Sequence, residues 1–164
     1  MASFEEHICQ AKSNLLFLTE VNKKFSANWD WQVTISFYVA VHLINSHLAT
    51  KADLHYKTHS DVKNSINPYN STAVFSVPQD VYLSYVKLEG LSRRARYLCH
   101  DDTSNSGDNK RSHTTYDKHF AKAIKNLDRI LKYFVNEYYV DFGKLEISCV
   151  ELNSNSGLLI FKVV

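Results

Sequence analysis

The residues best suited to chemistry lie together in the segment Arg93-Arg94-Ala95-Arg96-Tyr97-Leu98-Cys99-His100. Histidine titrates near neutrality and can transfer protons, whereas arginine presents a planar fork of N–H donors to phosphate oxygens. Successive residues of an α-helix are rotated by about 100°, so Arg93, Arg96 and His100 share one flank of a helix, and Glu89 joins them. Arg94 lies about 120° away from His100 and is expected to point elsewhere.

A flank of this kind could supply part of the machinery for metal-independent cleavage of RNA. That reaction needs a base for the 2′-hydroxyl proton, a cation for the charge on the phosphorane, and an acid for the leaving oxygen. We therefore treat Arg93, Arg96 and His100 as candidate catalytic residues. Structural roles are the alternative, because Glu89 and Arg93 are four residues apart and could form a surface ion pair. His100 could likewise cap the C-terminal end of the helix.

Four other residues are candidates for contacts with a nucleotide or another anion: Arg94, Lys63, His59 and His42. His42 shares an apolar stripe with Tyr38, where a hydrogen-bonded core histidine is the alternative, and the same alternative applies to His59. His55 and His59 are four residues apart, but no zinc signature and no third ligand accompany them. We therefore expect no metal site. The chain also has no glycine-rich loop that would cradle phosphates, and we expect no cofactor.

These side chains need a helical scaffold, and apolar residues at alternating spacings of three and four predict one. We expect long helices near residues 4–25, 28–48, 76–99 and 115–139, and a short helix over 58–66. The second long helix has two apolar stripes, Phe37 to Leu48 and Trp31 to His42, and should therefore lie in the middle of the bundle. Residues 101–113 are polar and are expected to form a solvated loop.

The last twenty residues change to a two-residue period that is typical of strands. Leu145, Ile147 and Cys149 alternate with polar residues, and a turn cluster at 153–157 precedes the apolar run 158–164. This pattern predicts a β-hairpin over residues 145–163. Because an isolated hairpin is marginally stable in water, it should dock on the helices or pair with another chain.

The fold class follows from these elements and from the composition. The chain has 164 residues, of which 45% are hydrophobic and 22% charged, with only four Gly and two Pro. A length of this order suits one domain, and few helix-breaking residues favour long helices. We predict an all-α, antiparallel bundle of four to five helices over residues 1–142, with a short C-terminal β-hairpin, residues 143–164, docked on it.

The net charge and the cysteines indicate which partners and which cellular compartment to expect. The net charge is +2, which is too small an excess to indicate a dedicated binder of duplex DNA. Cys9, Cys99 and Cys149 are scattered, which is typical of free thiols in a reducing compartment. No stretch has the apolar length that a bilayer span needs, and no secretory signal is evident at the N-terminus. We expect a cytoplasmic protein without a membrane partner.

Several spaced residues resemble the HEPN-like family of small helical proteins. The run Asp30-Trp31 followed by Phe37-Tyr38-x-Ala40-x-His42-Leu43 is similar to the second helix of that family, and His59 to a histidine that opens its short helix. The pattern from Tyr82 through Tyr85, Leu88 and Ser92 to Ala95-Arg96-Tyr97 resembles a later helix. The resemblance covers roughly residues 5–139. Lys63 departs from it, because an arginine is expected near that position.

The resemblance implies an antiparallel helical bundle that forms a homodimer. Many HEPN proteins are metal-independent ribonucleases with Arg, four to six residues and then His, a spacing that Arg93 and Arg94 both satisfy with His100. Others bind nucleotides or partner proteins, and some pair with a nucleotidyltransferase in toxin–antitoxin systems. The first hypothesis is therefore an RNA- or nucleotide-interacting protein, with ribonuclease activity in defence or toxin–antitoxin biology as its enzymatic version. The alternative is a non-catalytic interaction or oligomerisation module that uses the apolar tail 158–164.

Overall fold

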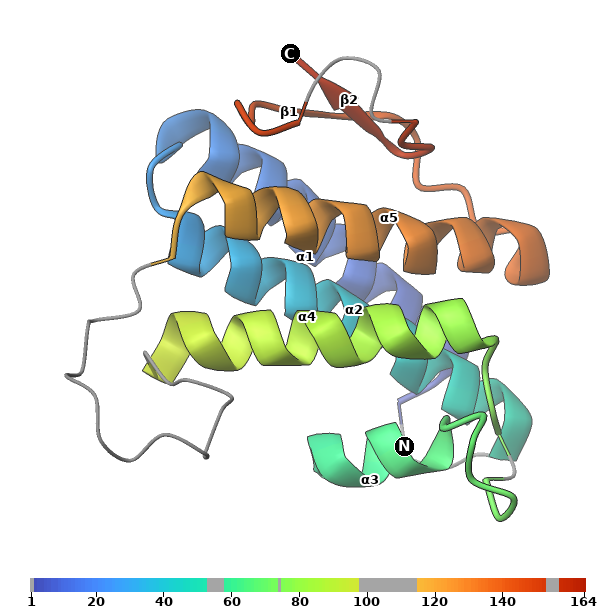
Figure 1. Cartoon of the computed structure of the whole chain (residues 1–164). Coiled ribbons are helices and arrows are strands. Elements are labelled where there is room, and N and C mark those ends of the chain that lie inside the picture. Colours follow the sequence, from blue (N-terminus) through green and yellow to red (C-terminus); the bar gives the residue numbers. More distant parts are fainter. Residues whose placement is uncertain (1, 53–57, 74, 98–114, 153–156) are drawn as a thin grey trace, which may run out of the picture.

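Five helices and two short strands form the chain, in a computed structural model that describes residues 2–52, 58–73, 75–97, 115–152 and 157–164 (Figure 1). The elements are α1 (Phe4–Lys24), α2 (Trp29–Ala52), α3 (His59–Ser65), α4 (Gln79–Tyr97), α5 (Asp117–Tyr138), β1 (Leu145–Ile147) and β2 (Phe161–Val163). The predicted all-α bundle is confirmed, and small strands follow it at the C-terminal end. Within the described ranges, no helix is long and apolar enough to cross a membrane.

Helix α2 is the central element, as its two apolar stripes predicted. It packs against α1, α4 and α5, so three neighbours cover most of its surface (Figure 1). The stripe from Phe37 to Leu48 is buried throughout. The second stripe is only partly covered, because Trp31 is 61% exposed and Tyr38 is 39% exposed while Ile35 between them is buried.

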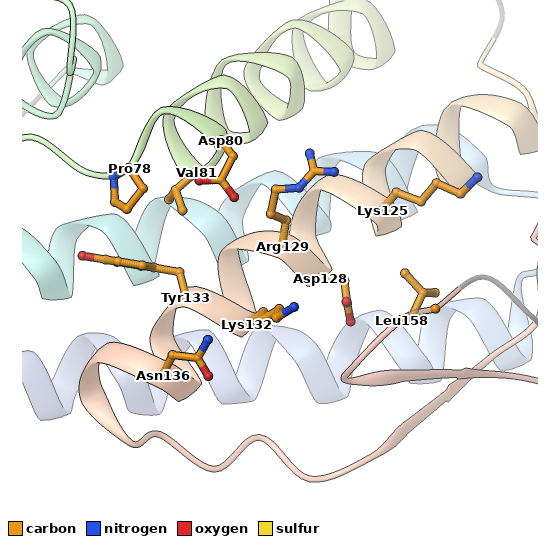
Figure 2. A pocket seen from close by; sticks show the side chains of 11 residues that line it. Pro78, Asp80, Val81, Lys125, Asp128, Arg129, Lys132, Tyr133, Asn136 and Leu158 are labelled. Atoms are coloured by element: carbon orange, nitrogen blue, oxygen red, sulfur yellow. The ribbon is translucent and has the colours of Figure 1, made fainter.

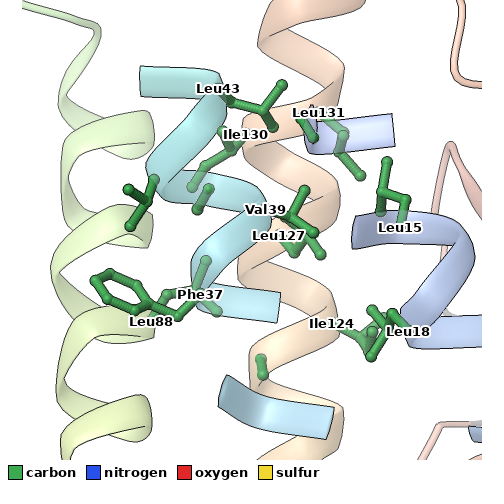
Figure 3. Close-up of a cluster of buried hydrophobic side chains, with 14 of the residues drawn as sticks. Leu15, Leu18, Phe37, Val39, Leu43, Leu88, Ile124, Leu127, Ile130 and Leu131 are labelled. Atoms are coloured by element: carbon green, nitrogen blue, oxygen red, sulfur yellow. The ribbon is translucent and has the colours of Figure 1, made fainter. Parts of the chain in front are cut away.

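The core lies between the four long helices, which run antiparallel to their sequence neighbours. Figure 1 shows that α1 and α2 run in opposite directions, as do α4 and α5, and one hydrogen bond links each pair, from Asn22 to Gln32 and from Arg129 to Ser84. Figure 3 shows leucine, isoleucine, valine and phenylalanine side chains from all four helices meeting in one layer. Helix α5 contributes an unbroken buried face, which includes Ile124, Leu127, Ile130, Leu131 and Phe134.

The C-terminal strands pair in parallel, so the predicted β-hairpin is wrong. Leu145 lies opposite Phe161 and Ile147 opposite Val163, and both strands run in the same direction. Parallel strands need a connection of about a dozen residues or more, whereas a hairpin needs only a tight turn. Residues 148–160 connect the two strands, and residues 153–156 of the predicted turn cluster lie outside the described residues.

Two aspartates of α5 explain why the chain returns before the second strand begins. The Asp117 carboxylate accepts hydrogen bonds from Cys149 Sγ at 2.8 Å and from the Glu151 N–H at 3.1 Å. The Asp128 carboxylate accepts from the N–H groups of Leu159 and Ile160, at 2.9 and 2.8 Å. The two carboxylates are separated by eleven residues, or about 16 Å along the helix axis. The chain must therefore travel back along α5 before it enters β2, which makes the strands parallel.

The strand pair is docked on the bundle of the same chain. Asn22 of α1 exchanges two hydrogen bonds with the backbone of Ser148, at 2.9 and 2.7 Å. Ile160 and Phe161 from the apolar tail are buried, whereas Val164 is exposed. Much of the apolar surface that suggested a docking site for a partner is therefore covered within the chain itself.

Candidate functional site

The last turns of α4 carry the three arginines that the sequence singles out. Arg93 is exposed, and Arg94 and Arg96 are partly buried. The Arg96 Nε donates to the Ser92 carbonyl at 3.4 Å, and its guanidinium carbon lies 5.1 Å from the centre of the Tyr97 ring. His100 lies outside the described residues. The predicted catalytic flank is therefore described only for its two arginines.

Arg96 belongs to a charged cluster that α3 and α4 build together. Lys63 of α3 pairs with Glu89 of α4, with the Lys63 Nζ 3.2 Å from the Glu89 Oε2. His59 opens α3 and places its ring edge-on against Phe37, with 5.1 Å between ring centres. Burial lowers the pKa of His59, while the charge of Glu89 raises it and that of Arg96 lowers it. The lowered pKa favours the neutral His59 ring, which can accept a proton.

The cluster brings together residues that the sequence predicted only as separate candidates. Glu89 links them, because it forms an ion pair with Lys63 and its charge, like that of Arg96, acts on His59. The suggested ion pair of Glu89 with Arg93 is not formed, because Glu89 pairs with Lys63 instead. That partner could not be read from the spacing within one helix, since it depends on how α3 docks.

Two buried hydroxyl groups lie on α4 next to this cluster. Tyr85 and Ser92 are fully buried, and neither hydroxyl has a hydrogen-bond partner among the residues that the structure describes. Burial raises the pKa of Tyr85, and the charge of Glu89 raises it further. Buried polar atoms are rarely left unpaired in folded proteins, because each one forfeits its hydrogen bonds to water. The two unpaired hydroxyls are therefore energetically unfavourable for the folded chain.

Arg94 faces the other neighbour of α4, as its helical phase predicted. Its positive charge acts on His119 in the first turn of α5. Burial, followed by the charges of Arg94, Lys118 and Lys122, lowers the pKa of His119. The His119 Nδ1 accepts the backbone N–H of Tyr116 at 2.9 Å, which is an arrangement of the neutral ring. The start of α5 is therefore an electropositive environment.

A row of exposed cations continues from that point along α5. The five residues recur at spacings of four, three, four and three, and we call them the α5 stripe: Lys118, Lys122, Lys125, Arg129 and Lys132. All five are exposed. The ion pairs formed within the described ranges lie elsewhere, at Lys24–Glu20, Lys63–Glu89 and Lys162–Glu146. The stripe is therefore positive without a neutralising carboxylate at pairing distance among the described residues.

The α5 stripe is not among the candidates predicted from the sequence, although its spacing is visible there. The spacing of three and four that marks the buried face of α5 also connects these lysines and Arg129 on the opposite face. The nearest acidic residues of the helix, Asp117 and Asp128, are engaged by the C-terminal segment. An overall charge of only +2 concealed this local concentration.

A polar groove lies beside the C-terminal half of the stripe. It has a volume of about 620 Å³ and is bounded by the start of α4, by α5 and by residues 157–158. Figure 2 shows Lys125, Arg129 and Lys132 on α5, Asp80 and Pro78 at the start of α4, and Leu158 on the far side. The Arg129 Nη1 donates to Ser84 Oγ at 3.2 Å, which holds its guanidinium near the groove. The groove thus combines cations with a limited apolar surface.

His42 lies apart from both basic regions. Its Nδ1 is 3.3 Å from the Nδ1 of His7, so it contacts α1. No group of three or more potential metal ligands occurs within the ranges that the structure covers. The chain matches no known protein family, no curated protein and no solved structure.

Proposed function

We propose that the protein binds RNA through the α5 stripe. The observation that carries this proposal is the row of five exposed cations with no described carboxylate at ion-pairing distance. Cations clustered along one helix face are the electrostatic footprint of proteins that bind nucleic acids. Binding releases counterions condensed on the phosphates, and this release favours association without any base contact.

The length of the stripe suits a chain of phosphates better than a single anion. Lys118 and Lys132 are fourteen residues apart, so the stripe spans about 21 Å along the helix axis. A single phosphate could contact one or two of these side chains. A polyanion that lies along α5 could contact all five at once, and Arg94 would extend the contact at the α4 side.

The choice of RNA rests on the resemblance to HEPN-like proteins over residues 5–139. A stripe alone would also suit other polyanions, so the experiment compares them. Labelled single-stranded RNA is titrated with the protein at low salt, with heparin and single-stranded DNA as competitors. Lys122→Glu/Lys125→Glu should reduce RNA binding at least tenfold, whereas Lys12→Glu/Lys23→Glu on α1 should have a much smaller effect. Equal losses in the two double variants would contradict a site on α5.

A second candidate function is metal-independent RNA cleavage at the α3–α4 cluster. The observation that favours it is the α3–α4 cluster, in which Glu89 pairs with Lys63, the charges of Glu89 and Arg96 act on His59, and burial lowers the pKa of His59. His59 could accept the 2′-hydroxyl proton, and the two cations could stabilise charge on the phosphorane. Arg93 and His100 remain candidates for the same reaction on the flank of α4.

Cleavage is tested separately from binding. RNA is incubated with the protein in excess EDTA, and the products are compared with those of His59→Ala, Arg96→Ala and His100→Ala. We expect each substitution to slow cleavage at least a hundredfold while RNA affinity changes less than threefold. Binding without cleavage by the unmodified protein would reject the enzymatic function and leave the proposed binding function intact.

A further inference from the structure

The groove beside α5 has a composition that a phosphate site alone does not explain. Its cations, Lys125, Arg129 and Lys132, line one side and belong to the α5 stripe. Asp80 lies on the side formed by α4, and Asn136 continues the groove beyond Lys132. A carboxylate inside the groove repels phosphate groups but can accept hydrogen bonds from N–H groups. The groove therefore suits a ligand with an anionic edge and a neutral, hydrogen-bonding body.

We propose that the groove receives one unpaired base of the RNA strand that lies along the α5 stripe. This inference rests on the proposed function and specifies its substrate as single-stranded RNA. The cations would hold the phosphates at the mouth of the groove, and the base would enter between α4 and α5. A volume of about 620 Å³ lies in the range of sites that hold nucleotide-sized ligands.

Side chains of the right chemistry are present for a base. The half-buried Tyr133 and the exposed Pro78 provide flat apolar surface on one side of the groove (Figure 2). Aromatic rings stack with all bases, because each base has a π face. Asn136 offers both a donor and an acceptor to a base edge, and Asp80 accepts from exocyclic amino groups.

The Asp128 carboxylate lines the groove as well, but it has a different role. It accepts the N–H groups of Leu159 and Ile160 and so holds Gly157 and Leu158 at the far side of the groove. The groove is thus completed by the C-terminal segment.

A preference for single strands follows from the geometry of the groove. The bases of a duplex are paired and stacked, so they cannot enter a groove unless a pair is opened. Duplex RNA should still contact the stripe through its phosphates, but without the contribution of the base. Stacking of one base on an aromatic side chain corresponds to roughly 5- to 150-fold in affinity.

The experiment measures the contribution of the base to RNA affinity separately from that of the phosphates. Affinities are measured for a single-stranded RNA, an abasic strand of the same length, and a duplex, each with the unmodified protein and with Asn136→Leu. Asn136 is exposed, so leucine should narrow the groove and remove the amide donor and acceptor, while the fold and all charges remain and no stacking ring is added. Asn136→Met is a second aliphatic variant, and Ser13→Leu on the exposed side of α1 is the matched control.

We expect the unmodified protein and Ser13→Leu to prefer the normal strand over the abasic strand by about tenfold. In Asn136→Leu and Asn136→Met this preference should fall below twofold, with abasic-strand and duplex affinities nearly unchanged. Equal affinity of the unmodified protein for normal and abasic strands would overturn the base site while leaving RNA binding by the stripe in place. A preference that survives in both Asn136 variants would overturn it as well. Absence of RNA binding by the unmodified protein would reject the proposed function itself.

Discussion

Removing charge from the α5 stripe should change how RNA binding depends on salt. The perturbation is Lys122→Gln/Lys125→Gln/Lys132→Gln, which removes three of the five stripe cations. All three side chains are exposed, and none forms an ion pair with a described residue. Arg129 is retained because it donates to Ser84 and contributes to the contact between α4 and α5. The fold should therefore be unaffected.

The magnitude follows from the number of phosphates that the stripe can neutralise. For single strands the logarithm of affinity falls with the logarithm of salt concentration, with a slope of about −0.7 for each neutralised phosphate. Five contacts give a slope of about −3.5, and the two that remain in the triple variant give about −1.4. Between 50 and 200 mM salt the unmodified protein should thus lose about 130-fold in affinity, and the variant about sevenfold.

Fluorescence anisotropy of a labelled single-stranded RNA over a series of KCl concentrations measures both slopes. The control is Lys12→Gln/Lys23→Gln/Lys24→Gln, which removes the same charge from α1 and should leave the slope within about 0.5 of that of the unmodified protein. A slope that stays near −3.5 in the stripe variant would refute the reasoning. So would an equal reduction of the slope in both triple variants, because net charge alone would then account for the effect.

Three further predictions concern stability. Asp128→Asn should lower the free energy of unfolding in urea by roughly 2–3 kcal/mol, because the carboxylate accepts two backbone N–H groups, whereas the exposed control Asp141→Asn should change it little. Tyr85→Phe should raise the same free energy by about 1 kcal/mol, since it removes a buried hydroxyl without a described partner; a loss above about 0.5 kcal/mol would contradict this. The pKa of His119 is lowered in the folded protein, so the unfolded chain binds the proton first as pH falls. His119 therefore stabilises the fold above about pH 6.5 and loses that contribution below it, and His119→Gln should flatten the decline in urea stability measured between pH 7 and 5.

The helices could be predicted because each one carries its own periodic pattern. Helix α5 is the clearest case, since its apolar positions from Phe120 to Phe134 are all buried. The direction of the strands could not be predicted in the same way. The turn cluster and the two apolar runs are compatible with either direction, and the choice is made by Asp117 and Asp128 on a different element. These contacts form only in the folded protein, so the residue pattern of the C-terminal segment alone does not reveal the direction of the strands.

In the candidate site, too, features within one helix could be predicted, whereas contacts between helices could not. Helical phase correctly separated Arg94 from Arg96, because both lie on one helix whose geometry is known in advance. The partners of Glu89 and His42 were not predictable, since Lys63 and His7 belong to helices that meet α4 and α2 only in the folded bundle. The α5 stripe belongs to the predictable class, because it uses the same spacing rule as the core.

The stripe is energetically unfavourable for an isolated protein, and this supports a binding role. Its five members form four like-charged neighbour pairs at spacings of three or four residues. Each such pair destabilises a helix by roughly 0.2–0.5 kcal/mol, so the stripe costs about 1–2 kcal/mol in total. An exposed helix face with mixed charges would gain a similar amount from opposite-charge pairs. A polyanion bound along α5 would remove the repulsion, so the feature that weakens the free helix is the same one that would favour the complex.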